Sequence, residues 1–384
     1  MIFYFILGTV ILGDALWIAL TVRRSRKAWQ KVTAVMWGTL QLGAVAGMLL
    51  ARSDVADFYN AAPRWVHSIV LIWHLLCVLP WLLWQLLRGL CALPLKLART
   101  ALPKPDRDGV TRREFLGASA AFIPPAFTIG GATIGEFQLD DFRIRKTTVP
   151  IASLPPALEG LTIAHITDLH AGRLTRGKVM ERIVAETNGL NPDVIALTGD
   201  LINDSLSAMP AVVDLVGGLR AKELLVSCEG NHDLIDNPSE FYRQAEKGGL
   251  NLLRNETTSV RIRDQLLQVL GLPWTRGAGR MADSVRELLA KRDPAAWQLM
   301  LAHHPHAWDL MEDVPLTLSG HSHGGQLMLN EALGAGPMVF RYWSGIYRKE
   351  QRTLAVSNGV GNWFPVRTAA PAEILHITLT RANS

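Results

Sequence analysis

Five short motifs built from aspartate, asparagine and histidine lie between residues 168 and 323 of this 384-residue chain. They read DLH at 168–170, TGD at 198–200, GNHD at 230–233, AHH at 302–304 and GHSH at 320–323. Most of them directly follow a short apolar run, which is typical of a buried strand. Because the ends of neighbouring strands meet at one edge of a sheet, we expect these side chains to converge.

Seven side chains in these motifs form a donor set for two metal ions. Carboxylate oxygen and imidazole nitrogen suit Mn²⁺, Fe or Zn²⁺, and the lack of thiolate ligands argues against a structural zinc site. Two cations about 3.5–4 Å apart that share a carboxylate can activate a water for in-line attack at phosphorus. We therefore expect two divalent metal ions, with Mn²⁺ favoured. The candidate ligands are Asp168, His170, Asp200, Asn231, His303, His321 and His323.

The segments around the motifs alternate between strand and helix signals. Apolar runs predict strands at 161–166, 194–197, 224–228, 251–253, 259–263, 266–270, 298–302, 316–318, 354–357 and 373–380. Helical spacing appears at 178–188, 209–219, 238–247 and 283–291. This order predicts an α/β domain with two packed mixed sheets flanked by helices. The segment 146–156 contains three prolines and is expected to be the entry to the domain.

The motifs, in this order, resemble those of the calcineurin-like metallophosphoesterase superfamily over about residues 145–380. The resemblance implies the four-layer sandwich of that superfamily and a metal-dependent phosphoric ester hydrolase. The segments LPPALEGLTIAHITDLHAG, GHSHGGQ and GVGNWFPVR, the last followed by PAEI, are similar to a bacterial membrane-associated branch. That branch is near enzymes that hydrolyse the diphosphate of UDP-2,3-diacylglucosamine.

The resemblance also implies a role for each candidate residue. The first metal would be held by Asp168, His170 and His323, the second by Asn231, His303 and His321, and both by Asp200. His232 would not bind metal, but would stabilise the phosphoryl charge and protonate the leaving oxygen. Asp233 would orient His232.

Other residues near the motifs have ordinary interpretations. His165 is expected to be a core residue or to support the ligands, and Cys228 to fill the sheet core. His304 falls where a variable residue usually stands, and His306 has no motif role. Arg367 is either a phosphate clamp or, as we favour, part of a surface ion pair. Tyr342, Trp343, Trp363 and Phe364 form either an apolar lip for an acyl chain or part of the core.

Residues 1–135 have a different composition, which predicts a membrane anchor ahead of a catalytic domain at 136–384. Runs at about 2–20, 32–50, 65–87 and 115–135 are long and apolar enough to cross about 30 Å of hydrocarbon. Residues 1–113 contain 14 Lys+Arg and 5 Asp+Glu, a net charge of +9, so the remainder carries −4. The basic pI therefore belongs to the anchor, and we expect no nucleic-acid partner.

The charges around these runs predict how the anchor is oriented. Loops at 21–31 and 88–113 are strongly basic, whereas the loop at 51–64 is balanced. Positive loops stay in the cytoplasm, so a multi-pass protein of the bacterial inner membrane with an extracytoplasmic catalytic domain is expected. The segment TRREFL at 111–116 is similar to a twin-arginine export signal, although two arginines anchoring an ordinary helix are the alternative. Asp14, His67 and His74 are expected to support helix packing rather than a proton relay.

Three functions fit this sequence. The first is a membrane-anchored hydrolase of phosphomonoesters or phosphodiesters, with a lipid-linked substrate favoured by the anchor. The second is a diphosphatase of the UDP-diacylglucosamine type, which the predicted topology opposes because such a substrate would be cytoplasmic. The third is a non-catalytic membrane sensor, which the complete set of ligands opposes. Nuclease activity is disfavoured by the net charge of −4.

Overall fold

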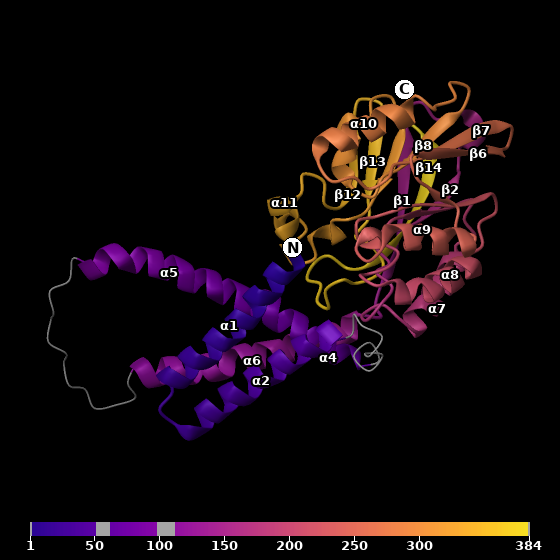
Figure 1. Ribbon diagram of the computed structural model, residues 1–384. Helices are drawn as coiled ribbons and strands as arrows, with labels where there is room; N and C mark the ends of the chain where they lie inside the picture. Colours follow the sequence, from indigo (N-terminus) through magenta and orange to yellow (C-terminus); the bar gives the residue numbers. More distant parts are fainter. Residues whose placement is uncertain (1, 51–61, 98–111, 383–384) are drawn as a thin grey trace. The chain divides into compact units, whose positions relative to one another are not determined.

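The computed structural model describes residues 2–50, 62–97 and 112–382. The chain divides into two compact units, Met1–Glu136 and Phe137–Ser384 (Figure 1). Several features expected from the sequence fall outside the described residues: most of the basic loop at 88–113, most of the balanced loop at 51–64, and the first residue of the twin-arginine-like segment.

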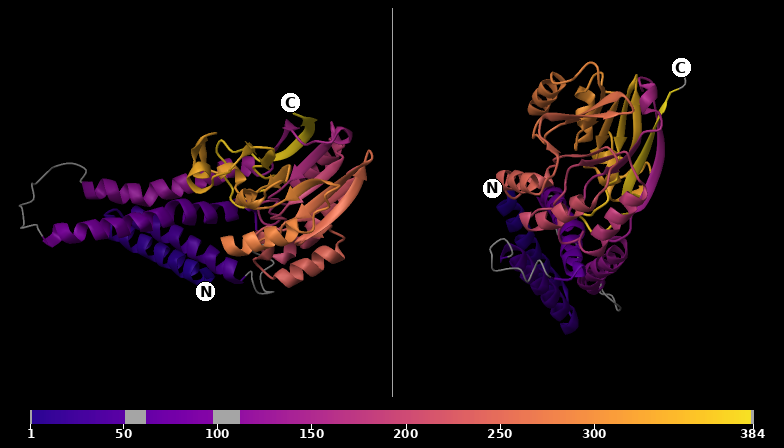
Figure 2. Two further views of the ribbon diagram at one scale, coloured as in Figure 1. Left: turned by 90° about the horizontal axis from the view of Figure 1, so that it is seen from above. Right: turned by 90° about the vertical axis from the view of Figure 1, so that its right-hand side faces the viewer.

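The first unit is helical over its described residues. Helices α1 and α2 pack against each other, and α4 continues through a π-helical turn, η1, into α5 (Figure 2). Helix α6 runs without a break through Pro124 and Pro125. The bounds are α1 Ile2–Arg24, α2 Ala28–Leu50, α4 Arg64–Ile72, η1 Trp73–Val78, α5 Leu79–Leu97 and α6 Arg112–Gln138.

One continuous helical stretch among the described residues, Arg64–Gly89, has the length and composition needed to cross a membrane, with a mean hydropathy of 2.0. It coincides with the predicted span at 65–87. The predicted spans at 2–20, 32–50 and 115–135 are also helical, but their described residues do not meet the same criterion. The structure therefore supports one of the four predicted spans, and it does not support a multi-pass anchor.

A buried carboxylate joins α1 to the stretch that begins with α4. Asp14 is fully buried, and its Oδ1 accepts a hydrogen bond of 2.7 Å from Trp73 Nε1. His74 Nε2 lies 3.0 Å from Asp14 Oδ2, and His74 Nδ1 lies 2.8 Å from the carbonyl of Val70. Because an unpaired buried carboxylate is costly, these contacts tie the helices together and fit the expected packing role.

The second unit contains two mixed six-stranded sheets, as predicted. The first has the order β1-β14-β2-β3-β4-β5, with bounds β1 Arg143–Ile151, β2 Thr162–Ile166, β3 Val194–Thr198, β4 Leu224–Cys228, β5 Leu252–Leu253 and β14 Glu373–Arg381. The second has the order β12-β13-β9-β8-β7-β6, with bounds β6 Glu256–Ile262, β7 Gln265–Gly271, β8 Trp297–Leu301, β9 Leu316–Ser319, β12 Gly345–Lys349 and β13 Arg352–Val356. A small pair, β10 Met328–Asn330 and β11 Leu333–Gly334, precedes the short helix α11 Ala335–Val339.

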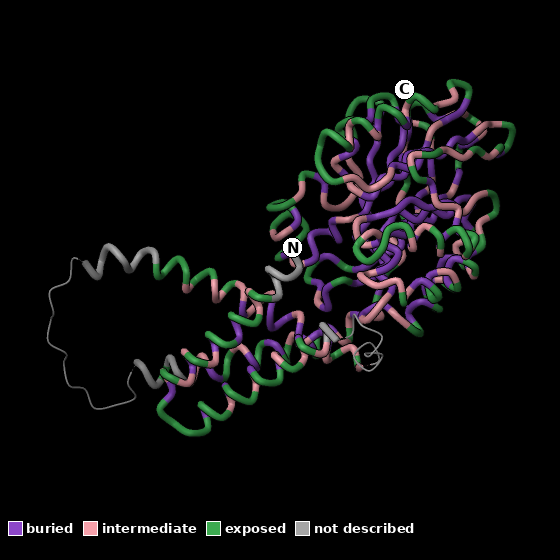
Figure 3. Tube along the Cα trace, in the orientation of Figure 1, coloured by how far each residue is buried: buried purple, intermediate pink, exposed green. Residues whose placement is uncertain are grey.

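The two sheets pack face to face, and helices cover their outer faces. On β3, Val194 and Ala196 pack between the sheets, whereas Ile195 and Leu197 pack under the helices. The outer helices are α7 Lys178–Gly189, α8 Met209–Gly218 and α9 Pro238–Lys247 on the first sheet and α10 Ala278–Leu289 on the second (Figure 1). Since both faces of the central strands are buried, these strands read as continuous apolar runs (Figure 3).

Strand β1 covers the first part of the entry segment at 146–156, where the sequence had predicted no strand. It pairs in parallel with β14 and forms the edge of the first sheet. Pro150 is accepted there because an edge strand has one side without a partner strand. The pairing is reinforced by Glu373 on β14, which is fully buried. Its carboxylate lies 3.2 Å from Arg143 and 2.8 Å from Arg145. Strand β12 was also missed.

We predict that Glu373→Ala destabilises the second unit by about 3–5 kcal/mol, because it removes one partner of a buried charge cluster. Thermal unfolding of the full-length protein, followed by circular dichroism, would measure the effect. Glu223→Ala, at an exposed position, is the control and should change stability by about 0.5 kcal/mol or less. Equal unfolding midpoints for the two variants would contradict a structural role for the cluster.

Candidate metal centre

The predicted ligands lie at the carboxyl ends of five strands. Asp168 and His170 follow β2, Asp200 follows β3, and Asn231 follows β4. His303 follows β8, and both His321 and His323 follow β9. The strands are parallel within each sheet, β2 to β4 in one and β8 and β9 in the other, so each set of ends lies at one edge (Figure 1).

The backbone at these strand ends adopts unusual conformations. Asp168, His170, Asp200, His321 and His323 all have φ between 45° and 70°. This left-handed region is uncommon for residues other than glycine, and such strain persists only where the surrounding structure enforces it. The structure around the strand ends therefore holds these residues in backbone conformations that are unfavourable in an isolated chain.

Glycines allow the loops to approach the ligands closely. A Cβ atom at Gly230 would overlap the carboxylate and the backbone nitrogen of Asp200. A Cβ atom at Gly320 would overlap Thr167 and Asp168. Glycine at these two positions allows the GNHD loop to pack against Asp200 and the GHSH loop to pack against Asp168.

The side chains form two groups that are suited to metal ions. In the first group, Asp168 Oδ1 lies 3.2 Å from His323 Nε2, and His170 Nε2 lies 3.0 Å from His323 Nε2. The second group contains Asp200, His303 and His321, with His303 Nε2 3.2 Å from Asp200 Oδ2. The same Asp200 oxygen lies 3.5 Å from His170 Nε2, so Asp200 links the two groups.

The chemistry of this donor set fits two divalent cations. The Oδ1 atom of Asn231 is buried and has no hydrogen-bond partner among the described residues, so a cation would satisfy it. Asp168 and Asp200 are both fully or almost fully buried. Two carboxylates removed from water need nearby positive charge. The clusters are consistent with a dinuclear site, although this donor set does not fix the identity of the metal.

Hydrogen bonds orient two of the ligand imidazoles. His170 Nδ1 lies 3.2 Å from the side-chain oxygen of Asn203, and His303 Nδ1 lies 2.7 Å from the carbonyl of Thr198. Each Nδ1–H therefore donates to an oxygen, and this turns Nε2 towards the centre. Burial lowers the pKa of His170 to about 3 and that of His321 to about 2, so both rings are neutral and can bind metal.

The buried carboxylates and imidazoles of this centre shift one another's pKa values. Burial raises the pKa of Asp168 to about 6, although His303 opposes the shift. Burial also raises the pKa of Asp200, but the imidazole of His303 outweighs this and holds the value below its ordinary range. Burial lowers the pKa of His303, yet the carboxylate of Asp200 raises it to about 9. Asp200 therefore stays ionised, as a carboxylate that binds metal must be.

His232 lies beside this centre. Its backbone N–H donates to Asp200 Oδ1 over 2.7 Å, its Nδ1 contacts the carbonyl of Asn203, and its ring meets that of His170 edge to face at 4.5 Å. His170, Asp200 and His232 also form a third group with metal-ligand spacing. Because Nδ1 is held by a carbonyl, Nε2 remains available on the other side of the ring.

Asp233 has different partners from those expected. Its carboxylate accepts hydrogen bonds from the backbone N–H groups of Leu201, Ile202 and Gly230, at 2.8, 3.1 and 2.8 Å. None of its hydrogen bonds within the described chain reaches the imidazole of His232. Asp233 therefore joins the loops after β3 and β4, and Asn203 rather than Asp233 orients the His232 ring.

Arg367 is not part of a surface ion pair, as we had favoured, because it is buried. Its guanidinium donates to the carbonyls of Asn358 at 2.9 Å and Gly361 at 2.7 Å. The Nη2 atom also lies 3.1 Å from His323 Nδ1. Arg367 thus holds the loop after β13 against a metal-ligand residue.

The remaining candidates are largely core residues. His165 is fully buried and lies 2.7 Å from the hydroxyl of Thr198, and burial raises the pKa of the Cys228 thiol. Tyr342 and Phe364 are buried, whereas Trp363 is 37% exposed. The four aromatic residues therefore do not form a continuous exposed lip.

Two residues near the centre were missed by the sequence analysis. Asn203 contacts His170 through its side chain and His232 through its carbonyl. The ring of Trp274 lies 5.1 Å from that of His321 and 5.8 Å from that of His303. Neither belongs to a motif, and only the position of Asn203 three residues after Asp200 hinted at its role.

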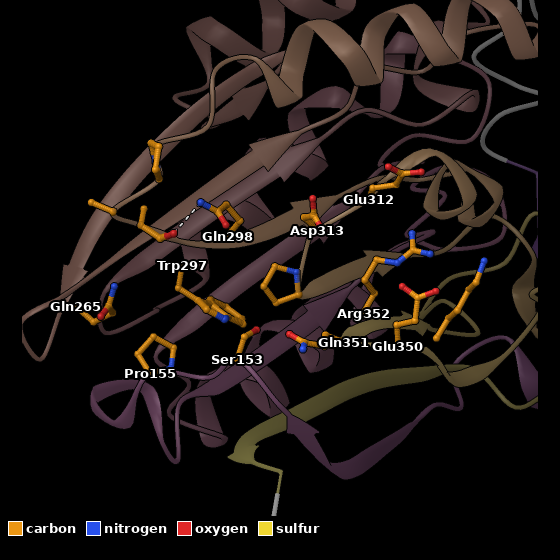
Figure 4. A pocket seen from close by; sticks show the side chains of 15 residues that line it. Ser153, Pro155, Gln265, Trp297, Gln298, Glu312, Asp313, Glu350, Gln351 and Arg352 are labelled. Atoms are coloured by element: carbon orange, nitrogen blue, oxygen red, sulfur yellow. Dashed lines mark hydrogen bonds between the residues drawn. The ribbon is translucent and has the colours of Figure 1, made fainter. Parts of the chain in front are cut away.

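A cavity of about 810 Å³ lies at the other ends of the strands (Figure 4). Gln265, Trp297 and Arg352, which begin β7, β8 and β13, line it together with Pro315. The metal-ligand candidates follow the carboxyl ends of the strands. This cavity lies at the amino ends of the strands, so it does not belong to the metal centre.

Sequence comparisons agree with this geometry. Residues 161–325 match the profile of the family described as calcineurin-like phosphoesterase. Over this segment the chain is similar to the calcineurin-like metallophosphoesterase superfamily. Its histidine and aspartate clusters are those of an intact metal site.

Three curated relatives illustrate the similarity. A "transmembrane protein with metallophosphoesterase domain" from Danio rerio is 29% identical, and the match covers 62% of this chain and 58% of the relative. An uncharacterized metallophosphoesterase from Helicobacter pylori is 26% identical, covering 63% and 65%, and YkuE from Bacillus subtilis is 27% identical, covering 71% and 99%. The chain thus spans less than two thirds of the first two relatives.

We predict that Asn203→Ala weakens metal binding about 10- to 100-fold, because His170 loses the acceptor that orients its ring. Titration of metal-free full-length protein with Mn²⁺, followed by calorimetry, would measure the change. Asn203→Asp is the matched control, since it keeps an oxygen for His170 Nδ1–H and should bind within about threefold of wild type. Wild-type affinity in the alanine variant would show that Asn203 does not position His170.

Proposed function

We propose that this protein is a metal-dependent phosphoesterase that hydrolyses phosphomonoesters or phosphodiesters, with a lipid-linked substrate. The observation that carries the proposal is the meeting of two carboxylate–imidazole groups at Asp200. When bound, two divalent cations, with Mn²⁺ expected, would supply an activated water and charge stabilisation at the phosphoryl group. The first would be held by Asp168, His170 and His323, the second by Asn231, His303 and His321, and both by Asp200.

In this proposal His232 acts on the phosphoryl group. The ring is partly exposed, and its Nδ1 faces the carbonyl of Asn203, which leaves Nε2 free for substrate. An imidazole in this position can stabilise a phosphoryl oxygen and protonate the leaving oxygen. Asp233 supports it indirectly by fixing the two loops that carry Asp200 and His232.

The lipid-linked substrate is supported by the predicted anchor. A site tethered to a membrane can reach a substrate that does not leave the bilayer. The stretch Arg64–Gly89 and the basic loops around the predicted spans support a membrane location, and one relative is named a transmembrane protein. In the proposed topology the catalytic domain lies outside the cytoplasm.

Topology also weighs against the diphosphatase alternative, because a UDP-linked lipid precursor would be cytoplasmic. A reporter that is active in only one compartment, fused after Ser384, tests this. We expect activity outside the cytoplasm, and activity restricted to the cytoplasm would reverse the topology and favour the diphosphatase.

We predict that the metal-stripped full-length protein regains hydrolysis on addition of Mn²⁺. Assays against a phosphomonoester, a phosphodiester and a UDP-linked glycolipid would identify the preferred bond, because each presents a different leaving group to the same centre. Metal-dependent cleavage of none of them, with two metals bound, would favour the sensor alternative.

We predict that Asp200→Asn and His232→Ala both lower kcat by about 10²-fold or more, for different reasons. Asp200→Asn should also lose bound metal, because the shared carboxylate is removed. His232→Ala should keep two metals per chain, measured by elemental analysis after dialysis. Loss of metal from the His232 variant would make that residue a ligand, as its place in the third group allows.

A further inference from the structure

A second cavity, of about 380 Å³, borders the metal centre. Its lining consists of Asn231, Leu234, Trp274, Thr275, Arg276 and Arg280. Asn231 is a metal-ligand candidate whose buried Oδ1 lacks a hydrogen-bond partner among the described residues. A molecule whose phosphoryl group lies at the metals could therefore extend into this cavity.

The loop after β7 that forms this cavity is fixed to the centre. The backbone N–H of Trp274 donates over 2.9 Å to Glu229, which directly precedes Gly230 and Asn231. The Trp274 ring packs 5.1 Å from that of His321. The loop thus has a defined position relative to the ligands, and so do the residues that follow Trp274.

Two arginines of the cavity carry charge that the protein does not neutralise. Arg276 and Arg280 are exposed, and the structure gives neither an ion pair among the described residues. Other exposed arginines nearby do have carboxylate partners, such as Arg286 with Asp283 at 3.0 Å. Helix α10 starts at Ala278 with no acidic residue in its first turn. The positive charge therefore faces the cavity without compensation.

We propose that this cavity binds a second phosphate group of the substrate, at a distance from the bond that is cut. The inference rests on the proposed function, and it narrows the substrate to phosphoesters that carry a further phosphoryl group. Guanidinium groups bind phosphate oxygens in pairs, and two arginines in one cavity provide two such forks. Arg276 and Arg280 are then specificity-determining residues, while bond cleavage depends on the metal centre.

Two ligands that differ by one phosphate test this site. Thymidine 5′-phosphate and thymidine 3′,5′-bisphosphate are titrated into full-length, Mn²⁺-loaded protein, and binding is measured by calorimetry. We expect the wild type to bind the bisphosphate at least about tenfold more tightly, because charge-assisted hydrogen bonds are the stronger ones. In Arg276→Gln/Arg280→Gln the preference should disappear, with affinity for the monophosphate nearly unchanged.

Arg286→Gln is the matched control, because it removes an arginine from α10 that does not line the cavity. It should keep the full preference for the bisphosphate. Equal binding of the two ligands by the wild type, or a preference that survives in the double variant, would overturn the inference.

A second measurement separates this inference from the proposed function. Release of p-nitrophenol from thymidine 5′-(p-nitrophenyl phosphate) reports hydrolysis of a substrate without the second phosphate. Release without any bisphosphate preference would refute the second site and leave the phosphoesterase proposal standing. A bisphosphate preference without release would support the second site and count against hydrolysis of this ester class.

Discussion

The carboxylate of Asp200 is the group on which the rest of the centre depends. It is almost fully buried, and the backbone N–H of His232 and the Nε2 atoms of His170 and His303 surround it. Removing a carboxylate from water is unfavourable unless charge and hydrogen bonds replace the solvent. The close approach at Gly230 follows from this requirement, because any side chain there would displace the carboxylate. The strained backbone at Asp200 has the same cause, because the contacts around the carboxylate fix the direction of the Asp200 side chain.

The sandwich provides this environment because its central strands are buried on both faces. Strands β2 and β3 place alternate residues between the sheets and under the helices, so neither strand has a polar face. The metal-ligand candidates appear where each strand ends and the chain turns away. The parallel strands of the two sheets bring these ends together, and the loops that follow β2, β3, β4, β8 and β9 carry the candidate ligands.

The same physics explains which parts could be predicted from sequence. The runs before Asp168, Asp200 and His303 are apolar because both faces are covered, and these runs predicted the strands and ligands. Strand β1 is an edge strand with mixed exposure and a proline, so it lacked that signal. Asn203 and Arg367 act through contacts that depend on the folded chain, Arg367 from 44 residues beyond His323. No local pattern marks such partners, because only the tertiary structure brings them to the ligands.

The candidate histidine ligands differ in the group that contacts their Nδ1 atom. His170 and His303 face oxygen acceptors through Nδ1, so each can present an Nε2 lone pair to a cation once any proton there is released. His323 instead faces the Arg367 guanidinium, which can only donate. His323 Nδ1 therefore accepts from the guanidinium, and His323 Nε2 lies 3.0 Å from His170 Nε2. The Nε2 atoms of two rings in the first group thus lie close together. The Arg367 guanidinium also donates to carbonyls of the loop after β13. The conformation of this loop and the orientation of the His323 ring therefore both depend on one buried charge.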